Sequence, residues 1–233
     1  MASANIYLVT EDPHNYPHWD QFCSIEEALE YCDKLPRIFT DTETTGLDSV
    51  IDDLHCIQIG DHKRQFVIDW RWRSVYLKKV KKLLEKDNVT VVFHNAVFDL
   101  AFLYKEEIKI RRIYDSLVAE KCLTLGLDRE RRDLASCVMK YCGLVVPKEE
   151  QGKIAMTGLT TREAIQYSGD DIYYLALLFK SQVKTVVAQG HTEQVSIVSQ
   201  FTRVLAYIEY CGVHLNKDSF MEIAERGEAE RYY

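Results

Sequence analysis

The sequence of 233 residues contains no long apolar run. None of its segments approaches the roughly 18 consecutive apolar residues of a membrane-spanning helix. The N-terminus, MASANIYLVTED, also has no basic region followed by an apolar stretch. These absences predict a cytoplasmic protein with no signal peptide, no transmembrane segment and no membrane partner.

A second absence concerns cysteine pairs. The seven cysteines are odd in number, and no two of them form a C-x-x-C motif. This distribution fits reduced, buried side chains in a reducing compartment better than a disulfide framework or a zinc site.

Excess positive charge is absent as well. The formal net charge is -7, opposite in sign to the usual footprint of a protein that binds nucleic acid. The charge argues against nonspecific coating of a long polyanion. It does not exclude an enzyme in which bound metal ions supply the local positive charge.

The sequence does contain the alternating elements of one α/β core. Hydrophobic residues make up 47% of the chain and charged residues 28%. Apolar runs predict strands at 6–9, 55–60, 65–69, 89–93 and 108–113, with a further strand ending near Glu43. Helical patterns lie at 24–33, 75–86, 95–103, 116–125, 134–141 and 160–184. The first begins with a capping-box pattern at Ser24 to Glu27, Asp133 is expected to open the helix at 134–141, and the last begins with a cap signal at Thr160. Short links between the strands around 43, 55–60 and 65–69 predict an antiparallel meander.

Two carboxylates stand at the end of the strand near residue 43. Asp41 and Glu43 are two residues apart and therefore share one face of that strand. Adjacent carboxylates at the end of a buried strand repel each other and lose hydration unless a cation neutralises them. Because only oxygen ligands are present, Mg²⁺ or Mn²⁺ is the favoured cation. A solvated acidic turn is the alternative interpretation.

Two more carboxylates occur in helical segments. Asn95 is positioned to cap the helix that follows strand 89–93, and Asp99 lies one turn further on. In the long helix at 160–184, Tyr167 and Asp171 are also one turn apart and point the same way. Asp170 competes with Asp171 as the functional carboxylate, and helical geometry alone barely separates them.

Taken together, the motifs D-x-E (Asp41, Glu43), HNAVFD (ending in Asp99) and Y-x-x-x-D (Tyr167, Asp171) resemble the three motifs of the DEDDy 3'-5' exonucleases. That group includes the proofreading domain of family A DNA polymerases and RNase D. The resemblance covers about Ile6 to Gln189. It implies an RNase H-like α/β fold, with a mixed central sheet, helices on both faces and a C-terminal helical extension.

The resemblance also implies a mechanism and a set of site residues. Two ions, Mg²⁺ or Mn²⁺, would be held by Asp41, Glu43, Asp99 and Asp171, and Tyr167 would orient the attacking water. Other positions are expected to contact the substrate: Thr42, Thr44, Leu47, His94, Asn95, Phe98 and Phe102. For Phe98 and Phe102 a core role is the favoured alternative. Asp115 and Lys148 fall where the family tends to carry an Asp and a Lys, and Lys148, Gln151 and Lys153 lie in a loop that is a candidate for approaching the substrate.

The tail resembles the segment that leads from exonuclease to polymerase in family A enzymes. It contains FTRVLAYIEY (201–210) followed by CGVHLN (211–216). We expect an exonuclease domain at 1–190 and a helical connector at 191–233, either in a polymerase fragment or in a free-standing enzyme of a bacterial or phage-infected cell. Packing of two helices on the core is the plainer interpretation of the tail.

The predicted activity is removal of nucleoside 5'-monophosphates from single-stranded or frayed 3' ends of DNA, with a polymerase domain as a partner in cis or in trans. An RNase D-like exoribonuclease is the first alternative. A catalytically silent nucleic-acid-binding relic is the second, and the intact set of five motif residues argues against it.

Overall fold

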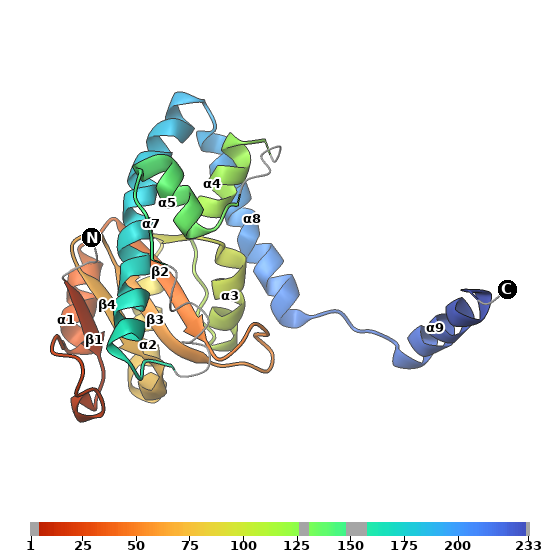
Figure 1. Ribbon diagram of the computed structural model, residues 1–233, viewed down its shortest axis with the longest axis horizontal. Helices are drawn as coiled ribbons and strands as arrows, with labels where there is room; N and C mark the ends of the chain where they lie inside the picture. Colours follow the sequence, from red (N-terminus) through yellow and green to blue (C-terminus); the bar gives the residue numbers. More distant parts are fainter. Residues whose placement is uncertain (1–4, 126–130, 148–157, 232–233) are drawn as a thin grey trace.

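The computed structural model describes residues 5–125, 131–147 and 158–231 (Figure 1). The strands of its sheet are β1 (Ile6–Val9), β2 (Arg37–Thr44), β3 (Leu54–Gly60), β4 (Gln65–Asp69), β5 (Thr90–Phe93) and β6 (Ile113–Asp115). The α-helices discussed below are α1 (Ile25–Asp33), α2 (Arg73–Leu84), α3 (Ala96–Lys105), α4 (Ser116–Leu123), α5 (Leu134–Cys142), α7 (Arg162–Ala188), α8 (Thr192–Cys211) and α9 (Lys217–Arg231). The loop residues Lys148, Gln151 and Lys153 lie outside the described residues.

The sheet is mixed, with the strand order β1-β4-β3-β2-β5-β6. Strands β2, β3 and β4 form the expected antiparallel meander, while β1 pairs parallel with β4 and β5 pairs parallel with β2 and β6. Parallel pairs need a crossover connection, and the crossover from β2–β4 to β5 runs through α2. This order places β2, which carries Asp41 and Glu43, in the interior of the sheet.

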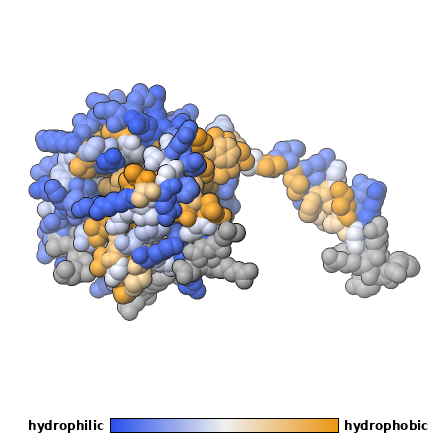
Figure 2. Space-filling model, turned by 90° about the horizontal axis from the view of Figure 1, so that it is seen from above, coloured by the Kyte–Doolittle hydropathy of each residue, from blue (hydrophilic) through white to orange (hydrophobic). Residues whose placement is uncertain are grey.

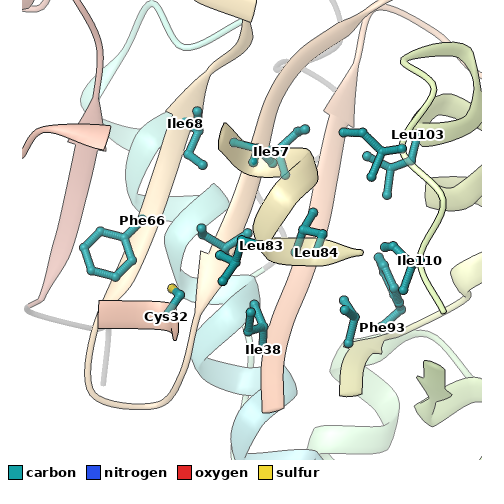
Figure 3. Close-up of a cluster of buried hydrophobic side chains, with 14 of the residues drawn as sticks. Cys32, Ile38, Ile57, Phe66, Ile68, Leu83, Leu84, Phe93, Leu103 and Ile110 are labelled. Atoms are coloured by element: carbon teal, nitrogen blue, oxygen red, sulfur yellow. The ribbon is translucent and has the colours of Figure 1, made fainter. Parts of the chain in front are cut away.

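One face of the sheet is covered by α1, α2 and α3. Alternate strand residues such as Ile38 and Ile57 point to this face and join Leu83 and Leu84 of α2 in the main apolar core (Figure 3). The capping box predicted for the first helix is confirmed, because Ser24 and Glu27 exchange both of its hydrogen bonds.

The long helix α7 covers the opposite face. Phe39 and Val92 pack against Ile172 and Leu175, which face the sheet from α7. Figure 1 shows α7 running across the sheet, with α5 beside it. The N-cap of α7 is Thr161, one residue later than the expected Thr160, since the Thr161 side chain accepts from the Ala164 amide.

Gly169 allows α7 to approach β1 closely. A Cβ atom at this position would lie 2.6 Å from side-chain carbons of Ile6. We therefore expect Gly169→Ala to lower the free energy of unfolding by about 1 to 3 kcal/mol through overpacking. Gly227→Ala is the matched control: it lies in α9 with nothing within 4 Å of the added Cβ, and should be neutral or slightly stabilising. Urea denaturation of both variants measures the difference; equal effects would mean that the close approach is unimportant.

The strand expected at 108–113 was placed too early. The observed strand β6 begins at Ile113, whereas Ile108 and Ile110 are buried without belonging to a strand. The Ile108 amide donates instead to the Leu103 carbonyl at the end of α3, so this part of the alternating pattern reflects a buried loop.

The C-terminal helices behave differently from each other. α8 lies along the edge strand β6: Ser199 accepts from the Asp115 amide at 3.2 Å, and Gln200 donates to the Ile113 carbonyl at 2.9 Å. This contact covers an otherwise open sheet edge. α9 stands away from the body of the protein, joined to it by residues 212–216 (Figures 1 and 2). Within the described residues, no helix is long and apolar enough to cross a membrane.

Candidate active site

Three carboxylates converge where β2 meets α7. The alternation of β2 puts Asp41 and Glu43 on the face that α7 covers, and Asp171 reaches them from that helix. One oxygen from each of the three lies within 4.8 Å of the others. The register of β2 on β3 shifts between Glu43 and Thr44, so the strand is irregular at this point.

These carboxylates form part of a cavity of about 650 Å³. Its lining comes from the end of β2 and the turn after it, the starts of α3, α4 and α5, the segments flanking α5 and the first half of α7. The residues are Asp41, Thr42, Glu43, Thr44, Gly46, Leu47, His94, Asn95, Phe98, Asp99, Leu117, Arg132, Asp133, Leu134, Ala135, Val146, Pro147, Tyr167 and Asp171.

Burial and mutual repulsion raise the pKa values of the acidic residues in this cavity. Burial raises the pKa of Asp41 to about 7. Burial and the neighbouring Asp41 charge raise the pKa of Glu43, Asp99 and Asp171 well above the usual range of carboxyl groups. A set of oxygen ligands that retains protons in the absence of metal suits a hard divalent cation, which would replace those protons.

Asp99 lines the cavity but stands outside the compact triplet. Its Oδ1 atom accepts a hydrogen bond from the Thr42 hydroxyl at 2.7 Å. The Thr44 hydroxyl likewise donates within the protein, to the Gly46 carbonyl at 2.6 Å. Both threonines line the cavity, and their hydroxyl protons are directed at protein acceptors rather than at a ligand.

Tyr167 lies beside Asp171 on α7, as their spacing predicted. Its hydroxyl is hydrogen-bonded to the Asp171 carboxylate. Burial and the charge of Asp171 raise the pKa of Tyr167 further above its usual value. The phenol is therefore protonated at neutral pH, and it can orient a ligand as a donor or acceptor but is a poor base.

Asp170 points elsewhere, although it neighbours Asp171 in sequence. Its Oδ2 atom accepts from Gln166 Nε2 at 3.1 Å, and it is not a member of the triplet. Successive helical residues are rotated by about 100°. The helix therefore turns only Asp171 toward Asp41 and Glu43.

The capping role expected of Asn95 is wrong. Asn95 adopts a left-handed conformation with φ of 74° and makes no side-chain cap. Asp115 caps α3 instead: its carboxylate accepts from the amides of Asn95 and Ala96 at 3.0 and 2.9 Å. The same carboxylate accepts from the Leu117 amide at 2.9 Å and so also caps α4. Asn95 keeps its place in the cavity lining.

The two aromatic candidates, Phe98 and Phe102, lie in different environments. Phe98 lines the cavity, whereas Phe102 is only 1% exposed and belongs to the main core. Their rings pack 5.1 Å apart, so Phe102 supports Phe98 from behind. The sequence favours a core role as the alternative for both residues. In the structure Phe102 has that role, whereas Phe98 lines the cavity.

Leu47 sits in a turn that Asp52 organises. It is 87% exposed at the mouth of the cavity. Asp52 organises the turn by accepting from the Asp48 amide at 2.9 Å, and a Cβ on Gly46 would lie 2.3 Å from the Asp52 carboxylate. A side chain at position 46 would therefore displace the Asp52 carboxylate that organises the turn.

His94 joins two parts of the cavity lining. Its Nε2 atom lies 2.8 Å from the Arg132 carbonyl, and Nδ1 lies 2.8 Å from the Ser116 hydroxyl. Burial lowers the pKa of His94, so its ring carries one proton at neutral pH. Since a carbonyl can only accept, that proton resides on Nε2. The Ser116 hydroxyl, which donates to the Phe93 carbonyl at 3.0 Å, lies beside Nδ1. His94 was expected to contact substrate; its ring nitrogens are engaged within the protein.

The segment Arg132 to Ala135 is not indicated by the sequence. It lines the cavity next to residues that are far away in the chain. The only signal is Asp133, which was expected to open a helix and does so by accepting from the Ser136 amide. Nothing in that capping pattern indicates that the residue before it reaches an active site.

An acidic cavity at the end of the central strands of a mixed sheet, lined by a triplet of carboxylates and a tyrosine among other residues, fits a hydrolase of the nuclease class. The chain belongs to the 3'-5' exonuclease family, whose sequence pattern matches residues 19–186.

Two curated relatives show how far the similarity extends. DNA polymerase I of Aquifex aeolicus (strain VF5) is 27% identical over 155 residues, covering 66% of this chain and 25% of the polymerase. RRP6-like 3 of Arabidopsis thaliana is 25% identical over 173 residues, covering 74% of this chain and 19% of that protein. The chain therefore spans a quarter or less of the length of these relatives.

Solved structures share the fold. Brucella melitensis NrnC superposes with a TM-score of 0.71 at 20% identity, covering 89% of this chain and 94% of NrnC. Escherichia coli RNase D superposes with a TM-score of 0.70 at 17% identity, covering 96% of this chain and 55% of RNase D. The mixed sheet with helices on both faces is thus the RNase H-like exonuclease fold, as expected from the motifs.

Proposed function

We propose that this protein is a metal-dependent exonuclease that removes nucleoside 5'-monophosphates from the 3' end of DNA. The observation that carries the proposal is the convergence of Asp41, Glu43 and Asp171 within 4.8 Å, in a cavity that Asp99 and Tyr167 also line. A structure of Brucella melitensis NrnC with bound Mg²⁺ supports the same type of cation here.

Each member of the proposed site has its own task. Two ions, Mg²⁺ or Mn²⁺, would supply an activated water and charge neutralisation at the phosphate and the leaving oxygen. Asp41, Glu43 and Asp171 would hold the first ion. Asp41 would be shared with the second, and Asp99, set back and oriented by Thr42, would reach that ion through water. Leu47 and Phe98 at the cavity surface would contact the terminal nucleotide.

The direct test uses a 5'-labelled single strand. We expect it to shorten one nucleotide at a time in Mg²⁺ or Mn²⁺, and EDTA should stop the reaction. Single strands and frayed ends should be cut faster than blunt duplexes, because the cavity requires an unpaired end. Release of mononucleotide from the 5' end while a 3' label persists would overturn the proposal.

Tyr167→Phe isolates the role of the hydroxyl group. It removes one polar atom beside Asp171 and leaves all four carboxylates in place. We expect kcat to fall roughly 10- to 1000-fold, as for the loss of one positioned polar group, with little change in Mn²⁺ affinity. Single-turnover rates and Mn²⁺ titrations would measure the two effects separately. Turnover equal to wild type would mean that another group orients the water.

RNA is the alternative substrate. The similarity to DNA polymerase I supports DNA, whereas RRP6-like 3 and the fold shared with RNase D support RNA. NrnC has also been solved bound to pGG, which makes a very short substrate worth including. Matched DNA and RNA oligonucleotides of one sequence, together with a dinucleotide, should be compared by kcat/KM. A clear preference for RNA would replace the DNA assignment.

We also propose that residues 191–233 form a connector to a polymerase domain in cis or in trans. Apolar side chains exposed along α8 and α9 support this, including Ile197, Phe201, Ile208 and Phe220. Figure 2 shows hydrophobic surface along α9, which stands apart from the body. Phe201→Ser with Ile208→Ser should reduce association with a family A polymerase domain in sedimentation while leaving exonuclease activity intact. Unchanged association would contradict this role.

A further inference from the structure

The proposed site has an uneven distribution of charge. Among the described residues that line the cavity, Arg132 carries the only permanent positive charge, and the acidic members are Asp41, Glu43, Asp99, Asp133 and Asp171. Two divalent ions would balance the four carboxylates proposed to hold them and would engage the scissile phosphate. A substrate strand brings further phosphates into the cavity, and those ions do not neutralise them.

Arg132 is held in place through its backbone. Its carbonyl accepts from His94 Nε2 at 2.8 Å, and His94 is fixed in turn by Ser116 at 2.8 Å. The residue after His94 is anchored separately, because the Asn95 amide donates to Asp115. The His94 ring therefore connects the start of the Asp99 helix to the segment that carries Arg132.

We propose that Arg132 binds a phosphate of the substrate strand adjacent to the scissile one, and that His94 is a positioning residue that sets where Arg132 stands. This inference rests on the proposed function. Arg132 enters the cavity from the segment before α5, whereas the carboxylate triplet comes from β2 and α7. A cation on a separate part of the lining meets a different phosphate from the one at the triplet. A guanidinium suits this task because its forked donors match phosphate oxygens.

Arg132→Met with Arg131→Met as the matched control tests the contact. Each variant removes one positive charge, but Arg131 does not line the main cavity and instead lines a smaller neighbouring one with Met139 and Lys140. We expect Arg132→Met to lower kcat/KM about 10- to 100-fold, mostly through KM, and to reduce the salt dependence by a slope of about 0.7. Arg131→Met should change neither, and Mn²⁺-induced thermal stabilisation should be the same in both. Equal kinetic effects of the two variants would overturn the proposal.

Substrates with one neutral linkage identify the phosphate. An uncharged methylphosphonate is placed, one position at a time, at the linkages upstream of the scissile one. At a single linkage, wild-type enzyme should lose about 10- to 100-fold in kcat/KM, whereas Arg132→Met should lose almost nothing. If every linkage affected both enzymes equally, Arg132 would not bind a phosphate of the strand.

The role of His94 is tested by non-additivity. His94→Ala should raise KM as Arg132→Met does, and the double variant should be no worse than Arg132→Met alone, since both changes remove the same contact. His94→Gln retains a side-chain N–H for the Arg132 carbonyl and should recover part of the loss, which a purely structural role in folding would not predict. Additive losses, or no recovery in the glutamine variant, would refute the positioning role.

The outcomes also separate this inference from the function on which it rests. If wild-type protein fails to shorten any strand from its 3' end in Mn²⁺, the proposed function fails. If wild type degrades strands normally while Arg132→Met matches Arg131→Met, only the inference fails.

Discussion

Asp171→Asn should abolish exonuclease activity, lowering kcat by about 1000-fold or more, while Asp170→Asn should leave it nearly unchanged. Asp171 contributes one of the three oxygens that lie within 4.8 Å of one another. Asparagine preserves the size of the side chain but removes a negative ligand from the position where the ions are proposed to act, so transition-state stabilisation is lost together with metal affinity.

The neighbouring carboxylate makes this comparison unusually well controlled. Asp170 is on the same helix, is buried to a similar degree at 9% against 8% exposure, and gives the same change in charge on substitution. Its observed partner, Gln166, can still hydrogen-bond to an asparagine. Rates under saturating Mn²⁺, with circular dichroism to verify folding, would measure both variants. Loss of activity in Asp170→Asn alone would show that the opposite assignment of the two aspartates is correct.

Asp41→Asn should make the metal-free protein more stable while removing its response to metal. Ionised carboxylate oxygens within 4.8 Å of one another repel by roughly 3 kcal/mol per pair at an effective dielectric constant near 20, an upper figure that water and the retained protons reduce. Without metal the native state carries the remaining repulsion and the cost of burying Asp41, and the unfolded chain carries neither. In EDTA at pH 7.5 we expect the variant to gain about 1 to 2 kcal/mol, or roughly 2 to 8 °C in Tm.

The stability of the metal-free protein should decrease as the pH rises. The pKa of Asp41 is about 7 in the folded protein and near 3.8 as a free group, so the native state binds the proton more tightly than the unfolded chain. The associated stability is fully present below pH 4 and is lost as the pH rises toward and through 7. Because metal must displace this proton, Mn²⁺ affinity should increase over the same interval.

Thermal melts from pH 5 to 8, in EDTA and in millimolar Mn²⁺, measure both effects. Wild-type Tm in EDTA should fall with rising pH relative to Asp41→Asn, and Mn²⁺ should raise the Tm of wild type but hardly that of the variant. The difference between the two proteins cancels the other titrating groups that they share. Equal stabilisation of both proteins by Mn²⁺ would mean that Asp41 does not belong to a shared metal site.

The sequence predicted best those features that depend on residues close together in the chain. Elements defined by local patterns were predicted well: the strand Ile6–Val9 has the expected limits, and the Ser24 capping box is present. The one-turn spacing of Tyr167 and Asp171 likewise predicted that they point the same way, and their side chains are hydrogen-bonded. These features depend on residues within a few positions of each other, where periodicity and capping chemistry act directly.

Features that depend on distant residues were predicted less well. The pattern at 108–113 alternates as a strand would, but Ile108 and Ile110 are buried in a loop because α3 supplies the hydrogen-bond partner. Asparagine is a residue type that favours helix caps, and Asn95 stands where a cap is expected. Asp115, 20 residues away, provides the cap instead. In both cases a tertiary contact replaced the local interaction that the residue type favoured.

By itself, the sequence determined the class of chemistry, because D-x-E on a strand and two i, i+4 helical pairs place carboxylates and a tyrosine in an order that few folds share. Only the tertiary structure decided which of Asp170 and Asp171 joins Asp41 and Glu43, that Phe102 lies in the core against Phe98, and that Arg132 lines the cavity. The physical reason is that local spacing sets the direction of a side chain relative to its own helix or strand, whereas the rotation and packing of that element against the sheet set what the side chain meets.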